Sequence, residues 1–136
     1  MIFNIIKKDN IDLLKKFIKL NNSSFFRYYD TRDIKIIKNH IITIILVDNE
    51  NIIGYGHLDF ENKMWLGICV LKKYRGNGYG KNIMEYLIEY AYKKNVDYIH
   101  LTVDKNNNIA KKIYEKYNFK VIEEKKNIYL MKKILT

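Results

Sequence analysis

The sequence has no proline, a single cysteine and no long apolar run, and each scarcity excludes a class of protein. Without proline or a Ser/Gly-rich stretch there is no candidate linker, so we expect one domain over residues 1–136. Cys69 alone permits neither an internal disulfide nor a cysteine-based zinc site, which favours a reducing, cytoplasmic setting. The longest apolar run, residues 41–47, is far short of the roughly 20 residues that cross a bilayer. Residues 1–8 lack the long apolar stretch of a signal peptide, so no membrane partner is expected.

Arginine is also scarce, although the chain carries a formal net charge of +10. The only arginines are Arg27, Arg32 and Arg75, and lysine supplies the rest of the positive charge. Sequence-specific readers of nucleic acid depend on the bidentate guanidinium of arginine, so we expect no nucleic-acid partner. A basic surface still suits a phosphate-bearing ligand. The histidines are widely separated in the sequence, which predicts no metal site.

The spacing of apolar residues predicts a mixed α/β domain, with an apolar residue every second position in strands and every three to four in helices. The order is strand, two helices, three strands, helix, strand, helix and two strands. A strand–loop–helix–strand crossover in this order predicts that strands 64–71 and 98–103 are parallel neighbours. The predicted strands are 1–6, 41–47, 52–59, 64–71, 98–103, 119–122 and 127–134. Four helices are predicted: the first starts after Asp9-Asn10, the second runs through Ile34 to Ile41, the third follows Gly80 and the fourth spans 106–117.

A glycine-rich loop, residues 72–81, joins a predicted strand to a predicted helix. Glycines there let backbone N–H groups converge, and the helix N-terminus adds free donors, so the loop suits phosphate. A P-loop would need glycine at Arg75 and serine or threonine at Asn82, and a dinucleotide fingerprint starting at Gly76 would need glycine at Lys81. Both of these nucleotide-binding motifs are therefore excluded.

The spacing that fits is Arg75-x-x-Gly78-x-Gly80, which resembles the pyrophosphate-binding loop of the GCN5-related N-acetyltransferase (GNAT) family. A second block, Asn107-x-x-Ala110-x-x-x-Tyr114-Glu-Lys-x-Asn118-Phe119, resembles a later motif of the same family. Asn118 stands where the family usually has glycine, and asparagine tolerates the left-handed conformation of a helix C-cap. The resemblance implies an α/β (α+β) GNAT fold, with a mixed sheet of about six to seven strands and helices on both faces.

The same resemblance implies acetyl-CoA as cofactor. The pantetheine arm is expected to pair with strand backbone, the pyrophosphate to lie on the loop amides, and basic side chains to add charge. Asn107 is expected to contact the pantetheine arm, to cap the helix that it precedes, or both. The remaining cofactor-binding residues implied in this way are Ile68, Cys69 and Val70 on the strand, and Arg75, Gly76, Asn77, Gly78, Tyr79, Gly80 and Lys81 on the loop.

The reaction implied by the resemblance is direct attack of an amine on the thioester in a ternary complex. Tyr114 would protonate the departing thiolate, unless it is simply a core tyrosine, and Ile68 N–H would face the oxyanion. Many relatives have a glutamate that acts as the general base near the start of the strand matching 64–71, where this chain has Met64 or Trp65. The nearest candidates for the base are His57 and Asp59, which alternate onto one strand face. A solvated polar face, with a water chain in place of a base, is the alternative.

Acceptor choice in the family depends on the region of the first two helices. Arg27, Tyr28, Tyr29 and Arg32 are concentrated there, and aromatic rings with arginines suit a sugar that carries phosphate. The sequence therefore favours a small-molecule amine, an amino sugar that is free or nucleotide-linked, unless the aromatics only anchor the first helix. Alternatives are a protein lysine or N-terminal amine, a basic nucleic-acid-binding module, or a CoA sensor without catalysis. Either a monomer or a homodimer is compatible with the sequence. Cys69 is predicted to be a buried apolar residue and not a nucleophile.

Overall fold

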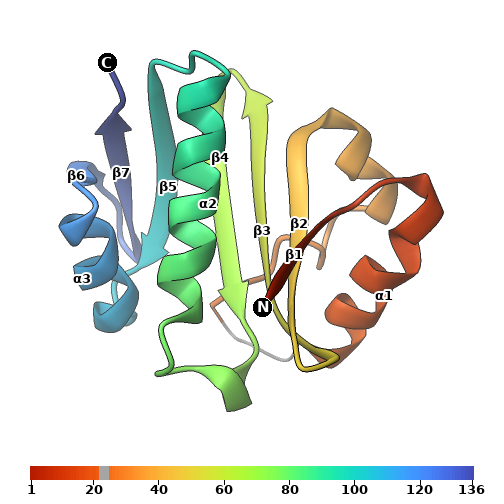
Figure 1. The fold of residues 1–136 in the computed structure, drawn as a ribbon. Coiled ribbons are helices and arrows are strands. Elements are labelled where there is room, and N and C mark those ends of the chain that lie inside the picture. The colour runs from red at the N-terminus through yellow and green to blue at the C-terminus, as the bar shows by residue number, and fades with distance from the viewer. Residues whose placement is uncertain (22–24) are drawn as a thin grey trace.

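The computed structural model describes residues 1–21 and 25–136, which form a seven-stranded sheet in the order β1-β2-β3-β4-β5-β7-β6 (Figure 1). The strands are β1 (Ile2–Ile5), β2 (His40–Asp48), β3 (Asn51–Glu61), β4 (Lys63–Val70), β5 (Tyr98–Asp104), β6 (Lys120–Glu124) and β7 (Ile128–Ile134). The helices are α1 (Ile11–Leu20), α2 (Tyr79–Lys93) and α3 (Asn108–Lys116), with short 3-10 helices η1 (Lys8–Asn10), η2 (Ile34–Asn39) and η3 (Lys72–Tyr74).

The sheet is mixed, and its one parallel pair lies in the middle. Strands β1 to β4 form an antiparallel meander, and β5, β7 and β6 form a second antiparallel set. The two sets meet where β4 runs parallel to β5, with α2 as the crossover between them, as the sequence predicts. Trp65 and His100 are the single registered pair of β4 with β5. Beyond this pair the two strands diverge toward their carboxyl ends (Figure 1).

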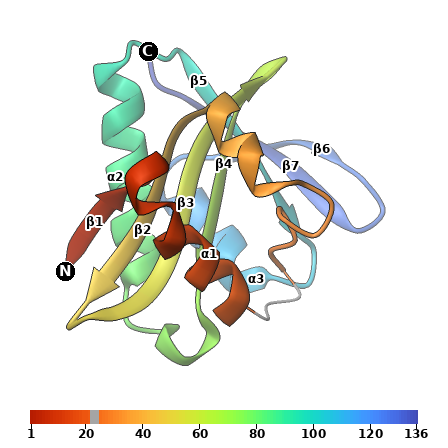
Figure 2. The same cartoon turned by 90° about the vertical axis from the view of Figure 1, so that its right-hand side faces the viewer.

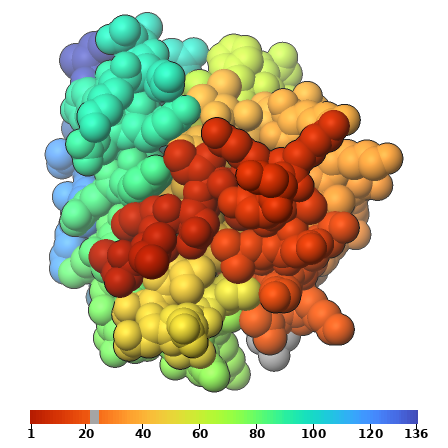
Figure 3. Space-filling view, turned by 45° about the vertical axis from the view of Figure 1, so that its right-hand side comes forward, coloured from red at the N-terminus to blue at the C-terminus, as the bar shows by residue number. Residues whose placement is uncertain are grey.

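Helices cover both faces of the sheet, because successive residues of a strand point to opposite faces. Ile44 and Leu46 of β2 belong to the core under α2, whereas Ile45 between them packs with Phe17 of α1. In Figure 2 the sheet is seen with α2 on one side and α1 on the other. The space-filling view shows α1 and η2 together as a layer in front of the strands (Figure 3). Among the described residues, no helix has the length and hydrophobicity needed to cross a membrane.

The second predicted helix is wrong in extent and type. Residues 34–39 form only the 3-10 helix η2, and Ile41 belongs to β2. Ile41 lies in an irregularity of the β2–β3 pairing, between the registered positions His40 and Ile42, and its β-branched side chain suits a strand. The first helix begins after Asn10, as predicted, but the Asn10 side chain bonds Ile5 and Lys7 and does not cap α1.

Candidate active site

The glycine loop presents a row of free backbone donors at the start of α2. Gly76 and Gly78 both have a φ of +83°, the left-handed region that favours glycine, and a Cβ on either would meet no atom within 4 Å. The first helical hydrogen bond runs from Asn82 N–H to Gly78 C=O at 3.2 Å. Within the described residues, the N–H groups of residues 78–81 therefore have no partner. Free amides at a helix N-terminus fit the pyrophosphate of coenzyme A.

Side chains of the loop mainly fix its shape. The Nε of Arg75 donates to Val70 C=O at 3.0 Å, and Asn77 Nδ2 donates to Tyr74 C=O at 3.1 Å. The Tyr79 hydroxyl donates to Asp48 at 2.7 Å, so this ring points to the β2–β3 turn and only its backbone faces the loop. Lys81 is exposed. The structure thus brings together every loop residue predicted to bind the cofactor, although Asn77 and Tyr79 use their side chains elsewhere.

The end of β4 offers unpaired backbone groups beside this loop. Leu71 N–H donates to Ile53 C=O at 2.9 Å, and backbone direction alternates along an antiparallel strand. The Cys69 backbone therefore faces its register partner Tyr55 on β3, while Ile68 and Val70 turn their N–H and C=O groups toward the diverging β5. The expected backbone contact from Cys69 is wrong for this reason. Ile68 keeps both backbone groups and Val70 keeps its N–H for pairing with an extended pantetheine arm, whereas the Val70 C=O already accepts from Arg75 Nε.

The Cys69 side chain is buried against α1, as predicted for an apolar residue. Its Sγ lies 3.5 Å from Asn21 Oδ1, and burial raises the pKa of the thiol to about 11. The thiol is therefore protonated at neutral pH, which is unsuited to nucleophilic attack.

Tyr114 lies on α3 with its ring edge-on to Phe119, at a centroid distance of 6.0 Å. Burial raises the pKa of the Tyr114 hydroxyl to about 12, so the phenol keeps its proton at neutral pH. No hydrogen bond to another described residue engages this hydroxyl, which leaves it available as a donor. Asn107 caps α3 by accepting from Ala110 N–H at 3.2 Å, as predicted. Asn118 adopts a φ of +69°, which explains how it replaces the expected glycine.

A row of polar and aromatic side chains crosses four strands on the face that α1 covers in part. His40 of β2 pairs with Asp59 of β3, Asp59 with Trp65 of β4, and Trp65 with His100 of β5. Trp65 occupies one of the two positions where the sequence expects the missing glutamate, so the nearest carboxylate in this row is Asp59 on the adjacent strand. His100 is buried, and its Nδ1 has no hydrogen-bond partner among the described residues.

His57 and Asp59 form a buried pair, which excludes the alternative of a solvated strand face. Only 3% of His57 and 7% of Asp59 is exposed, and His57 Nε2 lies 2.9 Å from Asp59 Oδ2. The other ring nitrogen of His57, Nδ1, lies 2.8 Å from the Tyr55 hydroxyl, which in turn contacts the Tyr29 hydroxyl at 2.9 Å. The imidazole therefore has both of its nitrogens engaged.

The buried groups are arranged as neutral imidazoles around an ionised carboxylate. Burial lowers the pKa of His57, and this outweighs the opposite effect of Asp59. Burial also lowers the pKa of His40 to about 3. Burial alone would raise the pKa of Asp59, but its hydrogen bond with His57, together with the effects of His40 and Tyr28, holds that pKa below its ordinary value. Asp59 therefore carries the negative charge of the cluster at neutral pH.

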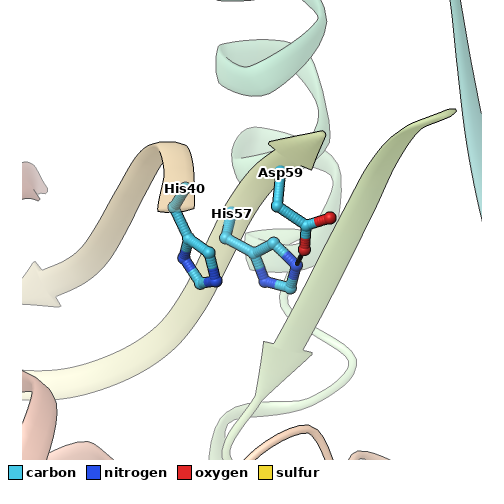
Figure 4. A group of neighbouring side chains, drawn as sticks. All are labelled: His40, His57 and Asp59. Atoms are coloured by element: carbon cyan, nitrogen blue, oxygen red, sulfur yellow. Dashed lines mark ion pairs between the residues drawn. The ribbon is translucent and has the colours of Figure 1, made fainter. Parts of the chain in front are cut away.

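His40 is a member of the cluster that the sequence did not single out. Its Nε2 lies 2.6 Å from the Tyr28 hydroxyl, and its ring stacks on His57 at a centroid distance of 4.5 Å (Figure 4). One donor atom each from His40, His57 and Asp59 lies within 4.8 Å of the others, a set that could hold a metal ion. The two rings are only 17° from parallel, so their in-plane lone pairs do not converge on one point. The observed arrangement satisfies hydrogen bonds instead of metal coordination.

The aromatic segment before η2 packs onto this cluster. The Tyr28 ring lies 4.5 Å from the His57 ring, and Arg32 lies over Tyr28 at 4.4 Å and donates to its backbone carbonyl at 3.2 Å. Tyr29 and Arg32 also line a hollow of about 280 Å³ with Lys15, Ile18 and Ile34. Arg27 is exposed. Of the predicted acceptor residues, Tyr28, Tyr29 and Arg32 therefore lie together and Arg27 projects from the segment.

A family model and two curated relatives agree on one protein family for this chain. The acetyltransferase (GNAT) family matches residues 10–119. The ribosomal protein bS18-alanine N-acetyltransferase of Haemophilus influenzae is 30% identical over 90 residues, which are 65% of this chain and 61% of the relative. GCN5-related N-acetyltransferase 6 of Arabidopsis thaliana is 34% identical over 56 residues, which are 41% of this chain and 19% of the relative. The matches thus span less than two thirds of either curated relative.

Solved structures share the fold over nearly the whole chain. A GNAT acetyltransferase from Streptococcus pneumoniae superposes with a TM-score of 0.82 at 21% identity, covering 99% of both chains. Naa50 of Arabidopsis thaliana, in complex with the bisubstrate analogue CoA-Ac-MVNAL, superposes with a TM-score of 0.76 at 25% identity, covering 97% of both chains.

Proposed function

Because this chain belongs to the acetyltransferase (GNAT) family, we propose that it transfers an acetyl group from acetyl-CoA to a primary amine in a ternary complex. The observation that carries the proposal is the continuity of free backbone groups between β4 and α2. Ile68 turns its N–H and C=O groups, and Val70 its N–H group, toward the β4–β5 divergence, while the Val70 C=O accepts from Arg75 Nε. The free amides of residues 78–81 lie beside this strand end, because a Cβ on Gly80 would lie 3.8 Å from the Val70 side chain. This surface matches an extended arm that ends in a pyrophosphate.

Different residues around this surface have different roles in the reaction. When bound, acetyl-CoA supplies the acetyl group as a thioester. Ile68 N–H stabilises the negative charge that develops on the carbonyl oxygen. Tyr114, protonated and without a described partner, donates its proton to the departing sulfur. The His57–Asp59 pair removes the proton of the attacking amine.

The acceptor that we favour is the α-amino group of a protein or peptide. The bS18-alanine N-acetyltransferase and Naa50, which was crystallised with a peptide-like bisubstrate analogue, support this class. The packing of Tyr28 against His57 supports it too, because that ring is already occupied within the protein and is not free to stack on a sugar. The net charge of +10 favours acidic peptides.

An amino sugar, free or nucleotide-linked, is the second candidate. One observation favours it: the hollow beside Tyr29 presents Lys15 and Arg32, and a phosphate group would suit this basic rim.

A panel of amines assayed for release of the coenzyme A thiol separates these acceptors. The panel contains acidic and basic peptides with free N-termini, the same peptides blocked at the N-terminus, amino sugars with and without a nucleotide, and polyamines. We expect thiol release with the free peptides and none with the blocked ones. Release with amino sugars alone would reverse the order of the two candidates. Failure of saturating acetyl-CoA to raise the melting temperature would contradict the cofactor assignment.

Tyr114→Phe tests the proposed acid. Loss of one positioned acid costs about 10²–10⁴-fold in rate, so kcat should fall steeply while the Kd of acetyl-CoA stays unchanged. Turnover with the best amine of the panel and calorimetric titration with acetyl-CoA measure the two effects. An unchanged kcat would mean that Tyr114 is only part of the core.

A further inference from the structure

The geometry points to Asp59 as the group that accepts the proton of the amine, with His57, His40 and Tyr28 as positioning residues that hold its carboxylate. This inference rests on the proposed function and divides the roles within the His57–Asp59 pair. It also gives a role to His40, and it moves Tyr28 from binding the acceptor to fixing a catalytic group.

Asp59 is the member of the pair with a free lone pair. Its Oδ2 contacts His57 Nε2 at 2.9 Å and the Tyr28 hydroxyl at 3.3 Å. Its Oδ1 has no hydrogen-bond partner in residues 1–21 and 25–136, yet it is not sealed from solvent, and 10% of the side chain is exposed. His57 has a more enclosed side chain, 4% exposed, and both of its ring nitrogens are engaged. A proton can therefore reach the pair through Asp59 Oδ1.

The carboxylate lies on the side of the cluster nearest to the cofactor surface. In Figure 4 it lies on the side of the His57 ring that faces away from His40. Because His40 belongs to β2 and the sheet order is β2-β3-β4, this is the side of β4. The β4 partner of Asp59 is Trp65, on the same strand as Ile68. The β4 partner of His57 is Gly67, and the His57 ring lies over this glycine, in the space that a side chain there would take.

Groups from separate elements fix the carboxylate. On β3, Tyr55 anchors the His57 Nδ1 at 2.8 Å. On β2, Thr43 Oγ1 anchors the His40 Nδ1 at 2.7 Å. The Tyr28 hydroxyl bridges His40 Nε2 at 2.6 Å and Asp59 Oδ2 at 3.3 Å. Each imidazole is thus oriented through one nitrogen and presents the other to the Asp59–Tyr28 side, which leaves the carboxylate a single position.

The proton transfer balances within the proposed reaction. As the nitrogen of the neutral amine forms its bond to the acetyl carbon, its N–H becomes acidic. The N–H bond then breaks, and Asp59 Oδ1 takes the proton. The carbon–sulfur bond breaks, and the sulfur takes the proton of Tyr114. Asp59 then releases its proton to water, and Tyr114 regains one from water, so both groups return to their starting forms.

Asp59→Asn tests the assignment because it keeps the shape of the side chain and removes its basicity. We expect kcat for the best peptide of the panel to fall about 10²–10⁴-fold, with the Kd of acetyl-CoA and the circular dichroism spectrum unchanged. A kcat within a few-fold of the wild type would overturn the assignment. A wild-type protein that acetylates no amine would instead overturn the proposed function, so the two failures are distinguishable.

Tyr28→Phe tests the positioning role through a spectroscopic readout that needs neither turnover nor the Asp59 variant. The carboxyl carbon of Asp59 is followed by ¹³C NMR as a function of pH. His57, Tyr55, His40, Tyr28, Tyr29 and Arg32 are the titratable and charged groups around it. The Tyr28 hydroxyl bonds the ionised form, so its loss should move the Asp59 midpoint toward higher pH.

The matched control is Tyr117→Phe, which removes a hydroxyl from another carboxylate, Glu85, away from this cluster. It should leave the Asp59 midpoint where it is in the wild type. A midpoint that Tyr28→Phe leaves unmoved, or an Asp59 protonated at neutral pH in the wild type, would overturn the inference even if Asp59→Asn failed to fold.

Discussion

Gly67 is the residue on which the position of the His57 ring depends most directly. A Cβ placed on Gly67 would lie 2.3 Å from His57 Cε1, closer than any real contact allows. The buried histidine and the glycine opposite it on β4 therefore form a single steric unit: a side chain at position 67 and the observed imidazole cannot coexist.

We predict that Gly67→Ala lowers the free energy of unfolding by about 1–3 kcal/mol, the range for overpacking a well-filled interior. Because the ring must move, its bond to Asp59 should weaken and kcat should fall as well. Chemical denaturation and turnover measure the two effects. Gly80→Ala is the control for stability, because a Cβ there would lie 3.8 Å from its nearest neighbour. Equal stability of the two variants would contradict the steric argument.

At the scale of elements, the start of α2 combines a turn requirement with a binding requirement. Gly78 is the residue before α2, and its φ of +83° costs an ordinary L-residue about 1–2 kcal/mol. Its amide is also among the free donors that face the proposed pyrophosphate. The loop therefore needs glycine at this position both for its conformation and for its open surface.

We predict that Gly78→Ala weakens acetyl-CoA binding and also lowers stability by about 1–2 kcal/mol. Calorimetric titration gives the Kd, and thermal unfolding without ligand gives the stability. The matched control is Asn95→Ala just past the other end of α2, where φ is +58°. That variant should lose stability without losing affinity. Loss of affinity in both variants would mean that folding alone explains the effect.

At the scale of the whole molecule, the net charge of +10 attracts an anionic ligand over distances longer than a contact. Such a field raises the association rate of an anion and is screened by salt, with a Debye length of about 8 Å at 0.15 M ionic strength. The loop amides, in contrast, act only at contact distance. Charge therefore steers the ligand and the loop holds it.

We predict that the Kd of acetyl-CoA rises with ionic strength, mainly through a slower association rate. Stopped-flow binding between 0.05 and 0.5 M salt, about a threefold change in Debye length, measures this dependence. S-acetylpantetheine, which lacks the phosphates, is the control and should show little dependence on salt. An affinity for acetyl-CoA that salt does not change would mean that the surface lysines are only solvated.

The sequence by itself determined the family, the order of the strands along the chain and the glycine-rich turn before α2. These depend on local rules: apolar periodicity sets strands and helices, positive φ at Gly78 and Asn118 requires particular residue types, and the Arg75–Gly80 spacing is contiguous in the chain. The parallel placement of β4 beside β5 follows from the same local order, because α2 carries the chain back to the end of the sheet at which β4 begins.

Only the tertiary structure decided which groups surround Asp59 and which backbone groups of β4 turn toward β5. His40, Tyr28 and His57 are separated in the sequence, and their meeting depends on the β2–β3 register and on how the segment before η2 folds onto the sheet. The expected contact between the Cys69 backbone and the cofactor was wrong because the register of β3 with β4 turns the Cys69 backbone toward Tyr55. The helical segment η2 ends at Asn39 because β2 begins with the next residue, His40, whose backbone is extended. Periodicity along the chain specifies faces of elements, but register and long-range packing between elements decide which side chains share a site.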